Sequence, residues 1–215
     1  NIHIVDRYMN TLKPLGVSND GNGLDYFLPD SANILPSDIE AFHHKDFVAF
    51  SIGGQHQTKR LPTEKMVSIC KQIKQPVLLL GGKNEGEEGD FIVNAAGDHV
   101  VNACGRINLH ASADLIRRSK VVISHDTGLM HIAAAFSKPM VSVWGNTVPA
   151  FGMSPYYPYQ SNTPSLIAQV QNLPCRPCSK IGYKKCPKGH FKCMNMMNEN
   201  AIIEFVNLQF LNLPH

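Results

Sequence analysis

Short apolar runs recur along this chain and constrain its fold more than any other feature. They cover residues 47–52, 77–80, 100–103, 121–124 and 140–144, with a spacing of roughly twenty residues. Continuous apolar runs of this length are typical of strands buried on both faces, because a half-exposed strand alternates polar and apolar residues. Helix-like patterns lie between the runs. We therefore predict an α/β fold, with a Rossmann-like, doubly wound parallel sheet.

The intervening segments show a helical spacing of apolar residues. One stripe consists of Met66, Ile69, Cys70 and Ile73. A second helix contains the apolar residues 115–116, and we interpret Ser112 as its N-cap. A third helix is expected over residues 128–136. The apolar settings of Cys70 and Cys104 predict that both thiols lie in the core.

The first part of the chain has a different composition. Residues 1–16 predict the end of a helix, because a proline and a glycine interrupt a helical spacing of apolar residues. Residues 17–45 are rich in Asn, Asp, Gly, Pro and Ser, which is typical of an extended linker. We predict that residues 1–45 form the end of a preceding domain and an interdomain linker, and that residues 46–215 form the Rossmann-like domain, with a Cys-rich segment at residues 175–193 and a C-terminal helix. The absence of an initiator Met suggests a fragment or a processed product.

Composition and charge exclude several classes of protein. Hydrophobic residues make up 43% of the chain and charged residues 17%, and no apolar run approaches the roughly 18 residues that cross a membrane. We therefore expect a soluble, globular chain. The net charge is +3, and ten histidines can add to it below neutral pH. This charge is too small for a dedicated nucleic-acid-binding protein, but it is compatible with a local anion site or with contact to an anionic membrane surface.

The apolar run at 121–124 leads into the turn Asp126-Thr127-Gly128, which opens directly into a helix-forming segment. The first N–H groups of a helix have no intrahelical acceptor, and they carry the positive end of the helix dipole. An anion placed before Gly128 would meet donors that already point toward it, so the turn predicts a phosphate site. The same residues also fit a tight strand-to-helix turn in which Asp126 or Thr127 only caps the helix.

Parallel sheets of this kind bind ligands beyond the carboxyl ends of their strands. That rule places four loops together, at residues 51–60, 81–88, 125–128 and 144–147. Gly53 and Gly54, followed by Lys59, could bring backbone donors and a positive charge to a second phosphate. Taken alone, Lys59 and Arg60 fit a solvated basic pair near a helix start better than a phosphate site.

Several motifs occur together, in an order that is more specific than any one of them. They are Lys59-Arg60-Leu61-Pro62, Leu80-Gly81-Gly82, the stretch from Arg106 to Arg117, Asp126-Thr127-Gly128-Leu129-Met130-His131 and Trp144-Gly145-Asn146-Thr147. With these motifs, over roughly residues 46 to 200, the chain resembles glycosyltransferase family 9, the ADP-heptose heptosyltransferases. The resemblance implies a GT-B enzyme, in which two Rossmann-like domains face a cleft. It also implies that residues 46–215 are the C-terminal, nucleotide-sugar-binding domain and that residues 1–16 are the tail of the N-terminal one.

The activity implied by this resemblance is inverting sugar transfer. A nucleoside diphosphate sugar, ADP-heptose by the family pattern, would donate heptose to a cell-envelope glycolipid such as lipopolysaccharide core. The resemblance further implies no cofactor and no obligatory metal, in agreement with the absence of an Asp-x-Asp cluster near these loops. It implies a cytoplasmic protein, with peripheral contact at the inner face of the bacterial cytoplasmic membrane, and no nucleic-acid partner.

The family pattern also implies roles for individual residues. Lys59 would bind the diphosphate together with backbone donors of the 127–129 turn, and Asp126 would bind a sugar hydroxyl. Glu85 is the nearest candidate for a ribose contact. His131 would contact phosphate or sugar, unless a neighbouring carbonyl satisfies its ring. The complete set of implied donor-binding residues is Gly54, Gln55, Lys59, Glu85, Asp126, Thr127, Gly128, Leu129 and His131.

Two positions depart from the family pattern. Leu61 stands where an aromatic residue is usual, and Lys83 stands where an acid is expected, which leaves the identity of the nucleotide open. The family's general base is a carboxylate of the N-terminal domain, so no catalytic residue is assigned in this chain. A second hypothesis keeps the fold and the nucleotide pocket but gives the domain a non-catalytic, regulatory role.

A Cys-rich segment, residues 175–193, lies near the end of the chain with the pattern Cys175-x2-Cys178-x7-Cys186-x6-Cys193. The four thiols could bind zinc in a reducing compartment. Free thiols packed under a loop, or one or two disulfides, are the alternatives, and we predict a metal-free segment because the spacing differs from that of common zinc knuckles. Lysines in the segment also allow a contact to nucleic acid, although only Tyr183 and Phe191 offer stacking surfaces beside them.

Overall fold

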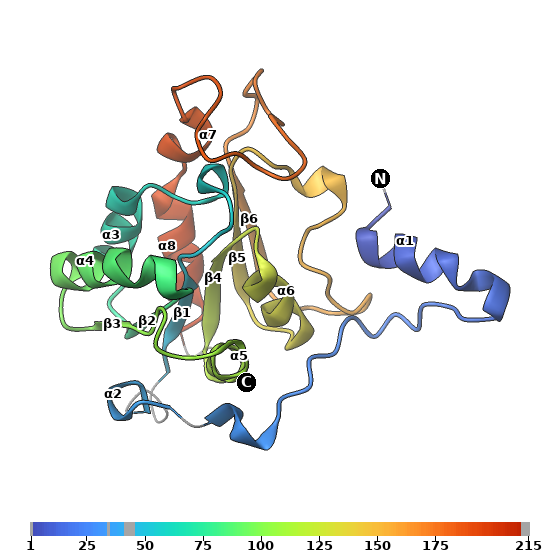
Figure 1. The fold of residues 1–215 in the computed structure, drawn as a ribbon, viewed down its shortest axis with the longest axis horizontal. Coiled ribbons are helices and arrows are strands. Elements are labelled where there is room, and N and C mark those ends of the chain that lie inside the picture. Colours follow the sequence, from blue (N-terminus) through green and yellow to red (C-terminus); the bar gives the residue numbers. More distant parts are fainter. Residues whose placement is uncertain (1, 34, 41–45, 212–215) are drawn as a thin grey trace.

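A six-stranded, fully parallel sheet forms the centre of the protein in the computed structural model, which describes residues 2–33, 35–40 and 46–211 (Figure 1). The strands are β1 (Val48–Ser51), β2 (Val77–Leu80), β3 (Val100–Asn102), β4 (Val121–His125), β5 (Met140–Trp144) and β6 (Ser165–Gln169). Their order in the sheet is β3-β2-β1-β4-β5-β6. The order reverses between β1 and β4, so the connections from these two strands leave toward opposite faces.

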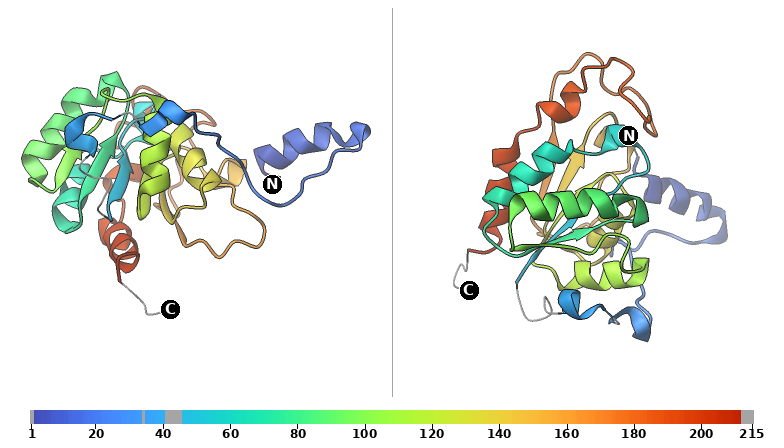
Figure 2. Two further views of the ribbon diagram at one scale, coloured as in Figure 1. Left: turned by 90° about the horizontal axis from the view of Figure 1, so that it is seen from below. Right: turned by 60° about the vertical axis from the view of Figure 1, so that its left-hand side comes forward.

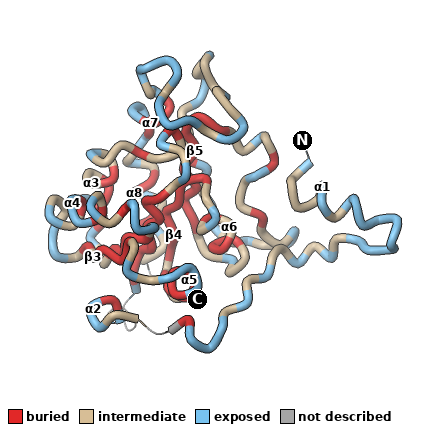
Figure 3. The backbone as a smooth tube through the Cα atoms, in the orientation of Figure 1, coloured by how far each residue is buried: buried red, intermediate tan, exposed pale blue. Residues whose placement is uncertain are grey.

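Helices cover both faces of the sheet (Figures 1 and 2). On one face lie α3 (Thr63–Gln72), α4 (Gly86–Ala96) and α8 (Glu199–Leu208), and on the other lie α5 (Leu109–Arg118) and α6 (Gly128–Ala135). Alternate strand residues enter the two cores, since Val48 and Phe50 join the first cluster and Ala49 joins the second. Figure 3 shows the buried strands between the exposed outer faces of the helices. The predicted Rossmann-like sheet is therefore confirmed.

Each predicted strand forms close to its expected position, but the strand β6 and the helix α4, among other elements, were not predicted. β6 is an edge strand in which only Ala168 is buried, so it lacks the continuous apolar run of the other strands. α4 begins inside the segment expected to be a loop, where glycines and acidic residues hide the helical pattern. Its Gly89 packs against β3, because a Cβ at this position would collide with the side chain of Asn102. Cys70 and Cys104 are buried, as predicted.

The N-cap of α5 differs from the prediction. Asn108 caps the helix, and its Oδ1 accepts a hydrogen bond from the Ala111 N–H at 2.9 Å. Ser112 lies inside the helix, buried, and its hydroxyl donates to the Asn108 carbonyl at 3.0 Å. The helix begins one turn earlier than the apolar stripe indicated. Its first turn does not continue the buried stripe, because Leu109 in this turn is exposed.

The N-terminal segment stands away from the sheet (Figures 1 and 2). The predicted helix is confirmed as α1 (Ile4–Thr11), followed by the 3-10 turn η1 (Lys13–Leu15) and by Gly16 in a left-handed conformation with φ of 75°. No residue of α1 is buried. Its Asp6 ties it to the body, since the Tyr156 hydroxyl donates to the carboxylate at 2.6 Å.

The predicted linker is extended only in its first part. It then forms η2 (Asp30–Asn33) and α2 (Ser37–Glu40), and Ile39 packs into the second core cluster. The expectation of an extended linker was therefore wrong for this part, while residues 34 and 41–45 lie outside the described residues. The remaining short helices among the described residues are η4 (Gln57–Lys59), η5 (Lys83–Glu85), η6 (Pro149–Phe151) and α7 (Lys192–Asn195).

The capping geometry leads to a stability prediction. Asn108→Ala should lower the free energy of unfolding by about 1 kcal/mol, because the first turn of α5 loses its side-chain acceptor. Ser112→Ala should cost less than about 0.5 kcal/mol, since alanine favours the helix and a hydroxyl bonded to the preceding turn adds little. Urea unfolding followed by circular dichroism measures both, and a larger loss for Ser112→Ala would contradict this assignment of the cap.

Candidate functional site

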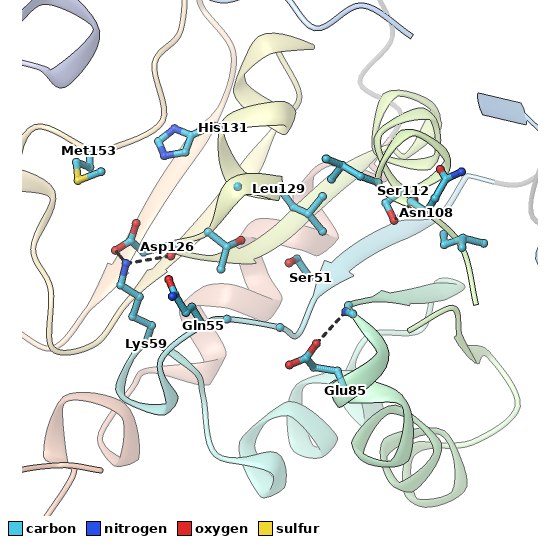
Figure 4. A pocket seen from close by; sticks show the side chains of 18 residues that line it. Ser51, Gln55, Lys59, Glu85, Asn108, Ser112, Asp126, Leu129, His131 and Met153 are labelled. Atoms are coloured by element: carbon cyan, nitrogen blue, oxygen red, sulfur yellow. Dashed lines mark hydrogen bonds and ion pairs between the residues drawn. The ribbon is translucent and has the colours of Figure 1, made fainter. Parts of the chain in front are cut away.

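A cavity of about 600 Å3 opens at the carboxyl edge of the sheet, next to the point where the strand order reverses. Its walls come from the ends of β1, β2 and β4 and from the start of α5 (Figure 4). All nine residues that the family pattern implied for donor binding line it, although they come from three separate segments, which follow β1, β2 and β4. These residues are Gly54, Gln55, Lys59, Glu85, Asp126, Thr127, Gly128, Leu129 and His131. Their roles remain predictions.

One wall of the cavity was not predicted from the sequence. Ile107, Asn108, Leu109 and Ser112 line it from the start of α5, and Met153 lines it from the segment after η6. The part of this wall that belongs to α5 was missed because the N-cap of this helix was predicted at Ser112 instead of Asn108. A usable signal was present, because two large apolar residues flank the capping Asn108, and Leu109 is 56% exposed although it is the first residue of the helix.

The turn before α6 presents its backbone to the cavity. Thr127 is the N-cap in extended conformation and makes no side-chain capping bond. The Gly128 and Leu129 N–H groups, as the first of the helix, have no intrahelical acceptor. A Cβ built at Gly128 would have no neighbour within 4 Å. Asp126 does not cap the helix either. The alternative in which Asp126 or Thr127 serves only to cap the helix is therefore not observed.

Lys59 and Asp126 form an ion pair at the cavity wall (Figure 4). The Lys59 Nζ lies 2.7 Å from the Asp126 Oδ2, and the two side chains are 16% and 7% exposed. The Thr147 hydroxyl donates to the same Oδ2 at 3.0 Å. The ammonium group of Lys59 is therefore held at the cavity by a carboxylate rather than dispersed in solvent.

Arg60 is also paired. Its guanidinium donates to Glu85, at 3.3 Å, and to Glu88 of α4. Glu85 accepts a further hydrogen bond from the Gly82 N–H, at 2.8 Å, so its carboxylate is anchored at the start of η5. Because both cations are held by carboxylates, the alternative of a solvated basic pair is wrong.

His131 lines the cavity on the first turn of α6, near Asp126 (Figure 4). Burial lowers the pKa of its ring below the ordinary value, and the negative charge of Asp126 only partly opposes this effect. Its imidazole is therefore mainly neutral at pH 7 and can donate one hydrogen bond and accept another. Within the described residues no carbonyl accepts a hydrogen bond from this ring. The alternative in which a neighbouring carbonyl binds the His131 ring is therefore not observed.

The cysteines of the Cys-rich segment are free thiols, so the disulfide alternative is wrong. Cys193 is buried, and the Cys178 Sγ donates to the Cys175 carbonyl at 2.8 Å. Across residues 2–33, 35–40 and 46–211, no group of three or more His, Cys, Asp or Glu side chains is arranged to hold a metal ion. The metal content of the segment remains a prediction.

Hydrogen bonds and packing hold the Cys-rich segment against the sheet. The Arg176 guanidinium donates to three carbonyls, those of Gly145, Thr147 and Val170. Cys193 and Met194 join the first core cluster beside α8.

Thr58 ties the segment to the Lys59 loop. Its buried hydroxyl accepts from the Tyr183 N–H at 2.8 Å and donates to the Tyr183 carbonyl at 3.1 Å. The segment therefore braces the loop that carries Lys59.

Similarity to known proteins assigns the chain to a family. The model of the family described as glycosyltransferase family 9 (heptosyltransferase) matches residues 2–184. This chain belongs to that family. Lipopolysaccharide heptosyltransferase 2 of Salmonella typhimurium is 28% identical over 127 residues, which are 55% of this chain and 36% of the relative. Lipopolysaccharide heptosyltransferase 1 of Pseudomonas aeruginosa is 29% identical over 165 residues, 73% of this chain and 44% of the relative. The chain thus spans less than half of each relative.

Solved structures of the family share the fold. The family 9 glycosyltransferase of Veillonella parvula superposes with a TM-score of 0.73 at 22% identity, over 97% of this chain and 60% of that one. The Escherichia coli heptosyltransferase WaaC with ADP superposes with a TM-score of 0.59 at 20% identity, over 92% of this chain and 53% of that one. At these identities the superpositions establish the fold, and the site rests on the residues of this chain.

The contact between Thr58 and Tyr183 leads to a second prediction. Thr58→Val keeps the shape of the side chain but leaves the Tyr183 N–H without an acceptor, so the free energy of unfolding should fall by about 1–3 kcal/mol. Thr11→Val, on the exposed end of α1, is the matched control and should change it by less than about 0.5 kcal/mol. Equal losses in the two variants, measured by urea unfolding, would show that the contact does not brace the loop.

Proposed function

We propose that this chain is the donor-binding part of an inverting glycosyltransferase, and that the full-length protein transfers heptose from ADP-heptose to a cell-envelope glycolipid such as lipopolysaccharide core. In this proposal residues 46–215 form the donor-binding domain, and residues 1–45 are the end of the preceding domain and the linker. One observation carries it, namely that all nine donor-binding residues implied by the family pattern line a single cavity.

The charges of the cavity suggest how a nucleoside diphosphate sugar lies in it. Lys59 and Asp126 meet on one side, and Asn108 and Ser112 of α5 lie on the opposite side (Figure 4). The diphosphate would lie against Lys59 and the N-terminus of α6, where unpaired backbone donors favour an anion. The nucleoside would then extend toward Glu85 and α5, while Asp126 and His131 would contact the sugar.

In sugar transfer with inversion, the acceptor hydroxyl attacks the anomeric carbon as the diphosphate leaves with the bonding electron pair. Negative charge grows on the bridging oxygen in the transition state. Lys59 and the N–H groups of α6 would stabilise that charge, and Asp126 would orient the sugar. The general base, which would take the proton of the acceptor hydroxyl as the new bond forms, is proposed to lie in the N-terminal domain, outside this chain.

Two kinds of comparison support the choice of substrate. The curated relatives are lipopolysaccharide and lipooligosaccharide heptosyltransferases, among them a lipooligosaccharide heptosyltransferase 2 of Haemophilus influenzae that is 35% identical over 79 residues. A second WaaC structure contains ADP-2-deoxy-2-fluoro heptose and superposes with a TM-score of 0.58 at 20% identity.

A glycolipid acceptor would bring the protein to a membrane surface. None of the helices in the described ranges is both long and apolar enough to span a bilayer. We propose peripheral contact at the inner face of the cytoplasmic membrane, which the net charge of +3 favours through attraction to anionic lipids. No nucleic-acid partner is part of the proposal.

ADP binding provides the direct test. We expect this chain to bind ADP equally well with magnesium and with EDTA, because Lys59 and α6 supply the positive charge. Lys59→Ala should weaken binding by about 1.5–3 kcal/mol, since a charge-assisted hydrogen bond is lost and Asp126 is left without its cation. Lys71→Ala, on the exposed side of α3, is the control and should leave the affinity unchanged. Calorimetry measures all of these, and strict dependence on magnesium would overturn the proposed role of Lys59.

A transfer assay separates the enzyme from a regulatory, non-catalytic nucleotide-binding domain. Residues 1–215 alone should transfer no sugar, because the general base and the acceptor cleft belong to the other domain. The full-length protein should transfer heptose from ADP-heptose to a lipopolysaccharide-core acceptor, with release of ADP as the readout. Binding of ADP without transfer by the full-length protein would favour the regulatory alternative. Robust transfer by residues 1–215 would place the base in this chain, with Asp126 or His131 as the first candidates.

A further inference from the structure

His125 is a fully buried side chain at the carboxyl end of β4, directly before Asp126. Its Nε2 lies 3.0 Å from the Leu61 backbone nitrogen, and its Nδ1 lies 3.2 Å from the Gly53 carbonyl oxygen. The Leu61 N–H can only donate and the Gly53 carbonyl can only accept. The ring must therefore carry its proton on Nδ1 and accept at Nε2, so its two neighbours select one neutral tautomer.

The two partners of this ring are the two ends of one loop. Between Gly53 and Leu61 lie Gly54, Gln55 and Lys59, which line the cavity. His125 itself is not among the residues that line the cavity. Any effect of the ring on a ligand must therefore pass through the loop.

The next residue after the ring holds the same loop at a different point. Asp126 pairs with Lys59 at 2.7 Å, while His125 fixes the base of the loop. Two consecutive residues of β4 and its turn thus determine where the Lys59 ammonium lies.

We propose that His125 is a positioning residue for the nucleoside diphosphate site, which holds the loop of residues 53–61 so that Lys59 reaches the diphosphate. This inference rests on the proposed function. A ring that bonds both ends of a loop limits the conformations available to the loop before the ligand arrives, so less ordering is required on binding.

The surroundings of the ring keep it in the required state. Burial lowers the pKa of His125 to about 4, the charge of Arg60 acts in the same direction, and the hydrogen bond to Gly53 partly opposes both. Phe50 of β1 packs beside it, with ring centroids 6.3 Å apart. The imidazole therefore remains neutral, and able to accept from Leu61, throughout the neutral pH range.

Substitutions can separate the two hydrogen bonds. His125→Gln places an amide oxygen near the position of Nε2 and retains an acceptor for Leu61. His125→Asn places an amide N–H near the position of Nδ1 and retains a donor for Gly53, whereas His125→Leu retains neither. His99→Leu is the matched control, because the His99 Nε2 bonds the Cys70 carbonyl at 2.9 Å, before β3 and away from the cavity.

The test is ADP binding by the whole chain, measured by calorimetry together with urea unfolding of each variant. His125→Leu should weaken ADP binding by about tenfold or more, and His125→Gln should stay within about threefold of the unmodified chain, because it still holds Leu61 close to Lys59. His125→Asn should fall between them. His99→Leu should lose stability with no change in affinity.

Several results would overturn the inference. Equal ADP affinity in the unmodified chain and in His125→Leu would do so, as would nitrogen-15 spectra that place the His125 ring proton on Nε2. If His125→Leu does not fold, a Gln variant that binds ADP no better than the Asn variant would overturn it as well. Absence of ADP binding by the unmodified chain would instead overturn the proposed function, and this inference with it.

Discussion

The reversal of strand order between β1 and β4 is the constraint on which the cavity depends. The register of the sheet pairs Ser51 with both Leu80 and Ser124, so β1, β2 and β4 end at one level. Neighbouring strands lie about 4.8 Å apart, and the loops that follow them therefore start side by side. Because helices leave toward opposite faces on the two sides of the reversal, no helix crosses the gap between these loops. The cavity occupies this gap.

The charges around the cavity are balanced within the protein. Lys59 is paired with Asp126, and Arg60 is paired with Glu85 and Glu88. A diphosphate at this position would compete with Asp126 for the Lys59 ammonium, so its attraction to Lys59 would be offset in part by the loss of this ion pair. The backbone donors at the start of α6 have no such competitor. They can favour an anion without the loss of an existing ion pair.

Much of the fold and of the cavity was predictable from the sequence, and the exceptions have physical reasons. Continuous apolar runs identified every strand that is buried on both faces, whereas the edge strand β6 has no such run. Nine residues of the cavity were predictable through the family resemblance, because its motifs stand at the same edge of the sheet, whereas the wall from α5 and Met153 was not predicted. His125 and Thr58 were not, since their roles depend on hydrogen bonds to residues far away in the chain. No local sequence pattern indicates such bonds. The cap at Asn108 was missed for a different reason, because the apolar stripe of α5 starts one turn later than the helix.

The contact between Thr58 and Tyr183 has a consequence for the order of folding. It joins residues 125 positions apart, and closing so long a loop is entropically costly. The strands and helices between them can pair with near neighbours first, but the Lys59 loop cannot acquire this support until the chain has been synthesised as far as Tyr183. Contacts of such wide separation slow folding. The Lys59 side of the cavity therefore gains this support only after Tyr183 has been synthesised, although most of the cavity residues belong to the first two thirds of the chain.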